Sequence, residues 1–282
     1  MTVSYRKRVF VNFVASLLML MSTLIGIVFL VWITWTTLRY GVSALRLDLF
    51  LNDTPPPGTG SYGLRNAFVG SLILLALAFV VGVPVGLMCG TWLAEFGRGG
   101  RPAQIVRFVN DIMLAAPSIE IGLFTYAILV DPIGHFSAYA GGVALAILMI
   151  PIIVRTTDEM LNLVSPELRE AAIALGTPQW KVITKITWKA AKTGIVTGIL
   201  IAIARISGET APLLFTALNN QFFSTDLAHP IANLPVVIFQ FAMSPYANWQ
   251  QMAWAGAFIS VVFVMVLTVF ARLLLARQYS KT

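Results

Sequence analysis

Long stretches without a charged residue are the feature that most limits what this 282-residue chain can fold into. Residues 9–38, 66–94 and 132–154 contain no Asp, Glu, Lys or Arg, and each exceeds the roughly 20 residues that a helix needs to cross a bilayer. In lipid the backbone must form its own hydrogen bonds, so such stretches are helical. Only 11% of the residues are charged, against about 25% in an ordinary soluble domain. The chain is therefore predicted to be an all-α membrane protein.

We predict six transmembrane helices within one domain that covers residues 1–282. The spans are expected at residues 10–36, 66–92, 108–130, 138–158, 193–217 and 252–275. The apolar run 231–243 is too short to cross, and we expect a helix at the interface or on the mouth of the bundle. The first span has the basic flank of a signal peptide. Its apolar run is too long for one, so we expect a retained helix.

The basic residues predict which side of the membrane each loop occupies, because cytoplasmic loops are rich in Lys and Arg. If the N-terminus is cytoplasmic, 15 of the 19 basic residues fall in cytoplasmic segments. They are Arg6, Lys7, Arg8, Arg98, Arg101, Arg107, Arg155, Arg169, Lys181, Lys185, Lys189, Lys192, Arg272, Arg277 and Lys281. Both termini are therefore predicted to be cytoplasmic. The same bias explains the net charge of +7 without a nucleic-acid partner.

The loop between the fourth and fifth spans contains strong helix-boundary signals. Ser165-Pro166-Glu167 supplies an N-cap, a first-turn proline and a first-turn acid. Gly176 is expected to end that helix, and Thr177-Pro178 to begin a second one. Two short helices joined by a sharp bend are thus predicted on the cytoplasmic side. Taken alone, this segment could be a plain connector, but a stiff hairpin would suit the transmission of force from a soluble partner.

The same loop resembles the EAA loop of ABC importer permeases. Glu170-Ala171-Ala172 is followed after three residues by Gly176 and, nine residues later, by Ile186. The Leu-Pro that usually follows is replaced by Trp188-Lys189. The resemblance implies the type I ABC importer permease fold, with a coupling loop over about 162–190. It also implies that the helix carrying Glu170, Ala171, Ala172 and Gly176 docks into an ATPase subunit.

The resemblance narrows in the fifth span. Residues 202–215, together with 117–124 and 231–236, are similar to the A-type permease subunit of phosphate-specific importers. This implies a multi-pass protein of the bacterial inner membrane, surrounded by lipid, that translocates phosphate with three kinds of partner. They are a homologous C-type permease, two ATPase subunits and a periplasmic phosphate-binding protein.

No phosphate-binding Gly-x-x-x-x-Gly-Lys-[Ser/Thr] sequence occurs in the chain. We therefore expect neither an enzyme nor a cofactor site here, with ATP and Mg²⁺ bound by the partner ATPase. A metal centre is not expected either, because the chain has one cysteine, Cys89, and two histidines, His135 and His229, that are far apart in sequence.

Arg205 and Glu209 lie inside the predicted fifth span, where charges are costly and indicate function by default. Being four residues apart on one helix face, they could simply pair. Alternatively they line a substrate pathway, together with Ser207 and Thr210. A guanidinium donates a planar fork of N–H groups to an oxyanion. A carboxylate accepts a hydrogen bond from the O–H that phosphate keeps near neutral pH and that sulfate lacks, so Glu209 would disfavour sulfate.

Other assignments stay open at this point. Glu120, inside the third span, fits a contact with a partner subunit as well as it fits the pathway. A permease for another oxyanion, such as sulfate or molybdate, is an alternative within the same class. An ion-coupled secondary transporter is a less favoured one, because it predicts inverted repeats that the sequence does not show.

Overall fold

The computed structural model describes residues 2–97 and 99–279, so Arg98 and Lys281 of the basic set lie outside the described residues. Every regular element in this part of the chain is a helix, which confirms the predicted all-α class. Five helical stretches are long and apolar enough to cross a membrane, and a bent pair makes a sixth. The five lie in α1 (Thr2–Ser43), α3 (Arg65–Glu95), α6 (Ala138–Asn162), the continuous run α8–η2–α9 and α12 (Ala247–Tyr279).

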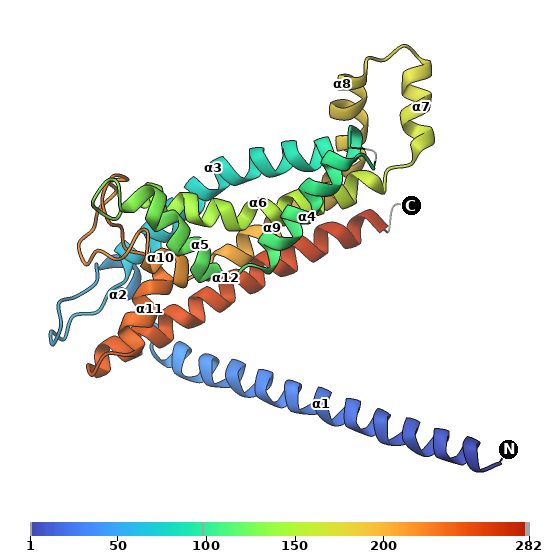
Figure 1. Cartoon of the computed structure of the whole chain (residues 1–282). Helices are drawn as coiled ribbons and strands as arrows, with labels where there is room; N and C mark the ends of the chain where they lie inside the picture. Colours follow the sequence, from blue (N-terminus) through green and yellow to red (C-terminus); the bar gives the residue numbers. More distant parts are fainter. Residues whose placement is uncertain (1, 98, 280–282) are drawn as a thin grey trace.

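The centre of the molecule is the pair α3 and α6, which run side by side (Figure 1). Gly82, Gly86 and Gly90 of α3 face α6, and a Cβ atom added to Gly86 or Gly90 would lie 2.7 Å from a side-chain atom of α6. Gly194 and Gly198 of α9 (Trp188–Ile206) meet side chains of α6 even more closely. Small residues at this spacing let helix backbones approach each other in lipid. The three helices therefore form one closely packed unit.

The expectation of a single helix over 108–130 is wrong. The chain forms α4 (Arg101–Ala115) and α5 (Ser118–Thr125), followed by the π-helical turn η1 (Tyr126–Val130), with a bend of 102° between the two halves. Ala116 and Pro117 between them have extended backbones. Proline has no N–H to donate and disfavours helical geometry in the residue before it, which explains the break.

The boundaries expected for the fifth span, 193–217, are also wrong. The helix runs from Gln179 to Ile206 and is followed by a turn and the short α10 (Ala211–Leu214). It thus begins within the hairpin and ends well before residue 217. The short helix expected within 231–243 is α11 (Leu234–Ala242), which packs against α12 and α3.

The predicted hairpin projects from one end of the bundle (Figure 1). Ser165 Oγ accepts a hydrogen bond from Leu168 N at the start of α7 (Pro166–Ala174), and Gly176 has φ +77° at the bend. Both local predictions are confirmed. The second helix differs from the prediction, because α8 (Gln179–Lys181) and η2 (Val182–Thr187) continue without a break into α9.

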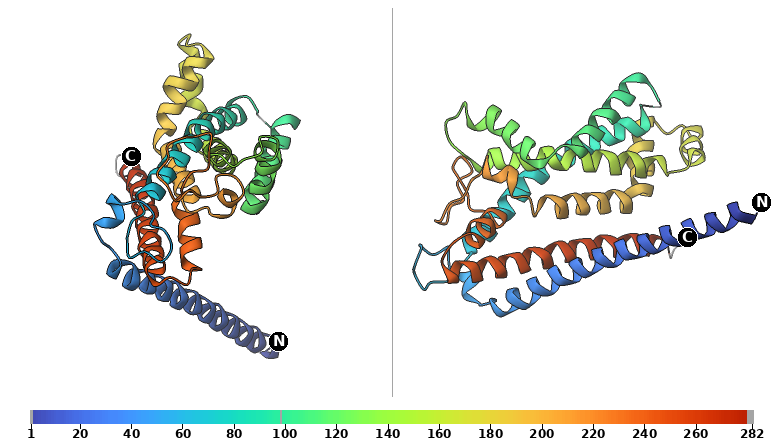
Figure 2. Two further views of the ribbon diagram at one scale, coloured as in Figure 1. Left: turned by 90° about the vertical axis from the view of Figure 1, so that its left-hand side faces the viewer. Right: turned by 60° about the horizontal axis from the view of Figure 1, so that its bottom comes forward.

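The first helix stands apart from the rest. The C-terminal end of α1 contacts α12, where the rings of Tyr40 and Trp254 are 5.2 Å apart. Toward its N-terminus α1 diverges from the bundle (Figure 1). A short α2 (Asp48–Leu51) follows it. The start of α1 and the last turns of α12 lie at the same end of the molecule as the hairpin (Figures 1 and 2). That this end is cytoplasmic stays a prediction from the charge bias.

Candidate functional site

The depth of Arg205 follows from helix contacts. Gly198 of α9 lies against Thr156 of α6, and the two helices run in opposite directions (Figure 1). Arg205 is seven residues further along α9, about 10 Å farther from the hairpin at 1.5 Å per residue. It is therefore level with the middle of α6. The last turn of α9 ends halfway across the bundle, and Arg205 is part of that turn.

Arg205 and Glu209 form an ion pair at this helix end. Arg205 Nη1 donates to Glu209 Oε1 at 2.7 Å. The sequence predicts both residues on one helix face, but α9 stops at Ile206 and Glu209 lies in the following turn. Its N–H is bonded there to the carbonyl of Ile206. The Arg205 side chain is 62% exposed in this chain, whereas that of Glu209 is only 9% exposed. The guanidinium is thus the accessible half of the pair.

This exposure limits what can cover the site in a membrane. A charged group at the bilayer centre faces protein or a water-filled cavity rather than lipid. Non-helical backbone at that depth, such as 207–210, has the same requirement. The face of α9 that carries Arg205 is therefore covered by another protein chain or lines an aqueous path.

The other predicted site residues lie on neighbouring elements. A Cβ atom added to Gly122 would be 2.7 Å from Pro212 Cα, so α5 packs directly against α10. Glu120 is in the first turn of α5, where the helix dipole favours a negative charge. Its side chain is exposed, and it has no ion pair within the described residues. α5 thus packs beside the turn that carries Glu209, and its first turn carries a second acid, Glu120.

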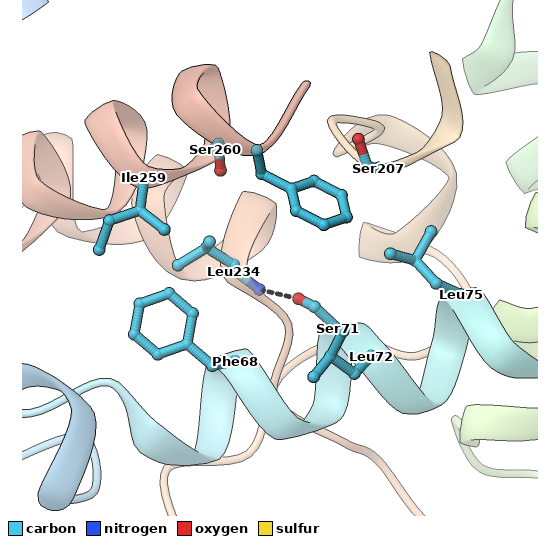
Figure 3. Close-up of a pocket in the computed structure, with 9 residues that line it drawn as sticks. Phe68, Ser71, Leu72, Leu75, Ser207, Leu234, Ile259 and Ser260 are labelled. Atoms are coloured by element: carbon cyan, nitrogen blue, oxygen red, sulfur yellow. Dashed lines mark hydrogen bonds between the residues drawn. The ribbon is translucent and has the colours of Figure 1, made fainter. Parts of the chain in front are cut away.

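Ser207 and Thr210 are half-buried around the same turn. The Ser207 hydroxyl donates to the carbonyl of Ala204 at 2.8 Å, and Ser207 lines a cavity of about 140 Å³ (Figure 3). The cavity is lined by Phe68, Ser71, Leu72, Leu75, Ser207, Leu234, Ile259, Ser260 and Phe263. Ser71 Oγ accepts a hydrogen bond from Leu234 N at 2.7 Å (Figure 3). Since no lining residue is charged, this cavity by itself cannot neutralise an anion.

A charged cleft of about 180 Å³ lies nearer the hairpin, between α4 and α6. Arg107 is 2.8 Å from Asp158, and Arg155 is 3.0 Å from Glu159 and 3.6 Å from Asp111. The pairs Arg107–Asp158 and Arg155–Asp111 each join residues more than forty positions apart, so no local pattern predicts them.

The two histidines, far apart in sequence, stack on each other at the end opposite the hairpin. The ring centroids of His135 and His229 are 5.5 Å apart, and His229 Nδ1 is 2.7 Å from Asp226 Oδ2. Hydrogen bonds from the Ala228 N–H and from His229 hold the pKa of Asp226 below its usual value. Among the described residues, no group of three or more His, Cys, Asp or Glu side chains could hold a metal ion.

The residues expected to contact an ATPase lie on α7 and at the bend after it. Glu170 and Ala171 are exposed, and so is Gly176 at the bend. Ala172 is buried within the hairpin, so its side chain is not available to a partner. The residue next to Glu170, Arg169, is turned toward the bundle and is 3.0 Å from Glu95 at the end of α3. The sequence analysis missed this pair.

Comparison with known proteins identifies the family. A family profile described as “Binding-protein-dependent transport system inner membrane component” matches residues 82–278. This chain belongs to that family. It is a multi-pass inner-membrane permease component of an ABC transporter, as predicted from the EAA loop.

Individual relatives cover nearly the whole permease. “Phosphate transport system permease protein PstA” of Yersinia pestis is 53% identical over 95% of this chain and 90% of its own length. The protein of the same name from Haemophilus influenzae is 56% identical over 89% of each chain. PstA 1 of Mycobacterium tuberculosis is 34% identical over 93% of this chain and 88% of its own.

Solved structures support the fold independently. A structure titled as an inward-facing conformation of the MetNI methionine ABC transporter superposes with a TM-score of 0.59, covering 75% of this permease and 95% of the solved chain. At 18% identity this likeness bears on the fold alone. It confirms the importer permease fold that the sequence predicted.

Proposed function

We propose that this permease is the membrane subunit through which an ATP-driven importer translocates inorganic phosphate into the cytoplasm, and that Arg205 lines the path. The exposed guanidinium at mid-membrane depth, paired with Glu209, is the observation that carries the proposal. The names of the relatives support phosphate as the substrate. An anion that crosses a low-dielectric region needs a compensating positive group, and Arg205 is the one basic residue within the predicted interior of any span.

The pair provides chemistry that suits phosphate. An incoming oxyanion replaces Glu209 as the acceptor of the Arg205 N–H groups, for which a planar guanidinium is well shaped. Phosphate near neutral pH keeps a proton, so its O–H donates to the Glu209 carboxylate. Sulfate has no such proton, and its charge is repelled by Glu209. Ser207 and Thr210 add hydroxyls beside the pair, and Glu120 lines the neighbouring segment.

The remaining parts of the transporter follow from the same proposal. A homologous C-type permease covers the exposed face of α9, and a periplasmic phosphate-binding protein delivers the substrate. Two ATPase subunits bind ATP and Mg²⁺. They dock on α7 through Glu170 and Ala171, which are exposed, and the bend at Gly176 sets the angle of that helix. ATP-driven motion of α7 then switches the path between outward and inward access.

Reconstituted transporters that contain Arg205→Gln test the proposal. We expect uptake of labelled phosphate to fall at least about tenfold with assembly intact, since a hydrogen bond to a charged group contributes about 1.5–3 kcal/mol. Arg205→Lys should restore only part of it, because an ammonium keeps the charge and loses the fork. Arg155→Gln is the matched control, because Arg155 also pairs with a glutamate four residues later and is 55% exposed, but lies nearer the hairpin.

Normal uptake by Arg205→Gln would contradict the pathway role and leave Arg205–Glu209 as a structural ion pair. Uptake of labelled sulfate or molybdate in place of phosphate by the wild-type transporter would assign the permease to another oxyanion.

A further inference from the structure

The hairpin is joined to the membrane helices by a partly buried arginine that the sequence does not single out. Arg169 of α7 donates from Nε and Nη2 to Glu95 Oε1, at 3.2 Å and 3.0 Å. It also donates to the carbonyls of Leu161 and Val164, at and just after the end of α6. One side chain therefore joins three elements: α7, the last residue of α3 and the C-terminal end of α6.

The second arm of the hairpin reaches the same turn of α3. Trp188, where α9 begins, donates its indole N–H to Thr91 Oγ1 at 3.1 Å. Thr91 and Glu95 are four residues apart and so lie on one face of α3. Trp188 stands near where the EAA loops of related permeases usually have Leu-Pro. Both helical segments of the hairpin, the one with Arg169 and the one that ends at Trp188, thus form hydrogen bonds with a single turn of α3.

Burial makes this joint stiff. The side chains of Arg169 and Glu95 are 18% and 7% exposed, so water screens the pair little. Separating the two side chains would leave a buried charge without its partner, and the cost of doing so holds the pair together. From this turn α3 runs along α6 through Gly82, Gly86 and Gly90, as far as the level of Met149. That is the depth at which Arg205 lies.

We infer that Arg169–Glu95 and Trp188–Thr91 form a two-point joint that transmits motion of the hairpin to the α3–α6 pair and thereby to the mid-membrane site. These are positioning residues, and none of them touches the substrate. The inference rests on the proposed function, because it presupposes that an ATPase moves α7. It predicts that breaking the joint separates ATP hydrolysis from transport.

The experiment uses the complete transporter in proteoliposomes and measures three quantities: ATPase bound per permease, ATP hydrolysed, and labelled phosphate imported per ATP. For Arg169→Gln and Glu95→Gln we expect bound ATPase to be unchanged and phosphate per ATP to fall at least about fivefold, the lower end of typical coupling between sites. Arg169→Lys should recover part of the loss. Trp188→Phe keeps an aromatic ring, removes the indole N–H and should cause a smaller fall.

Arg107→Gln is the matched control. It breaks another arginine–carboxylate pair, in which Arg107 is 2.8 Å from Asp158. Arg107 also donates to a backbone carbonyl, that of Leu93, but it makes no bond to the hairpin. Its ratio of phosphate to ATP should stay at the wild-type value. If Arg169→Gln and Glu95→Gln leave the ratio of phosphate to ATP unchanged, the inference is overturned. This holds even if the amount of complex falls, because a merely structural role lowers the amount of complex and does not change the ratio. Failure of the proposed function would instead be visible in the wild type, as an absence of ATP-dependent phosphate import.

Discussion

Two arginine–glutamate pairs in this permease have the same chemistry and opposite environments. Arg205–Glu209 lies at mid-membrane depth with one hydrogen bond and an arginine that is 62% exposed. Arg169–Glu95 lies beside the hairpin with four hydrogen bonds from an arginine that is 18% exposed. Within the described residues the first guanidinium donates through Nη1 alone, whereas Nε, Nη1 and Nη2 of the second all donate to the protein. Exposure and remaining donors, rather than charge, are the grounds on which we assign the first pair to the proposed substrate site and the second to the proposed joint.

The comparison also explains why only one pair stands at a break in a helix. Arg205 is in the last turn of α9, where the polypeptide turns away and leaves the side chain uncovered. Arg169 is inside α7, and its side chain bridges two helix ends. A site that must exchange partners needs open space on one side, and a joint needs contacts on all sides.

The largest expected effect comes from neutralising the mid-membrane pair completely. In the double variant Arg205→Gln/Glu209→Gln, no charge is left unpaired, so assembly should be normal. We nevertheless expect phosphate uptake at least about tenfold below wild type, because the charged donors are lost. The measurement is initial uptake at equal amounts of complex. Recovery of uptake in the double variant would show that the two charges only make each other tolerable.

A more selective effect is expected from Glu209→Gln alone. The substitution removes the negative charge and keeps an acceptor oxygen, so phosphate uptake should persist within about threefold. Inhibition by competing sulfate should strengthen about tenfold, since repulsion between like charges is worth several kcal/mol. The assay is labelled phosphate uptake against increasing sulfate. If sulfate competes no better than with wild type, Glu209 does not discriminate between the anions.

A smaller effect is expected from Gly122→Ala, which disturbs the contact between α5 and α10 beside the mid-membrane site. The new Cβ atom would lie 2.7 Å from the backbone Cα of Pro212, so α5 must move away from α10. Overpacking of this kind costs about 1–3 kcal/mol, and we expect uptake to fall about threefold. Gly60→Ala is the control, because nothing lies within 4 Å of the added atom. Equal uptake by the two variants would mean that the α5–α10 contact does not shape the site.

The smallest effect should follow the loss of the N-cap of α7. The bond from Leu168 N to Ser165 Oγ is long, at 3.4 Å, and Arg169 holds the same helix more firmly. Ser165→Ala should therefore lower the free energy of protection against amide exchange in the first turn of α7 by less than about 1 kcal/mol. Phosphate per ATP should not change. A fall as large as that of Arg169→Gln would assign the transmission of motion to the whole hairpin rather than to the joint.

The sequence predicted what local patterns determine. Uncharged runs located the first, second, fourth and sixth spans, and Ser165 with Gly176 located the ends of α7. Proline was ambiguous: Pro117 breaks the third span, but Pro84 and Pro151 lie inside continuous helices. Whether a proline breaks a helix depends on neighbouring helices that can support the freed backbone groups. Such support is not visible in a single sequence.

The candidate site shows the same limit. The spacing of Arg205 and Glu209 predicted their contact, but not that the helix ends between them or that only the arginine is exposed. Glu95 and Arg169 are separated by 74 positions, and no periodicity connects them. Only the tertiary fold, in which the Arg169 side chain reaches the ends of α3 and α6, brings the two charges together.

The central claim is that Arg205 faces an aqueous path, and thiol accessibility tests it most directly. Because Cys89 is the only cysteine, Cys89→Ala provides a background in which Arg205→Cys carries the single thiol of this permease. In the complete transporter, with the partner subunits freed of reactive cysteines, a membrane-impermeant thiol reagent should modify Arg205→Cys and should leave Ala202→Cys, at a fully buried position, unmodified. Absence of modification of Arg205→Cys, both with ATP and without it, would contradict the account.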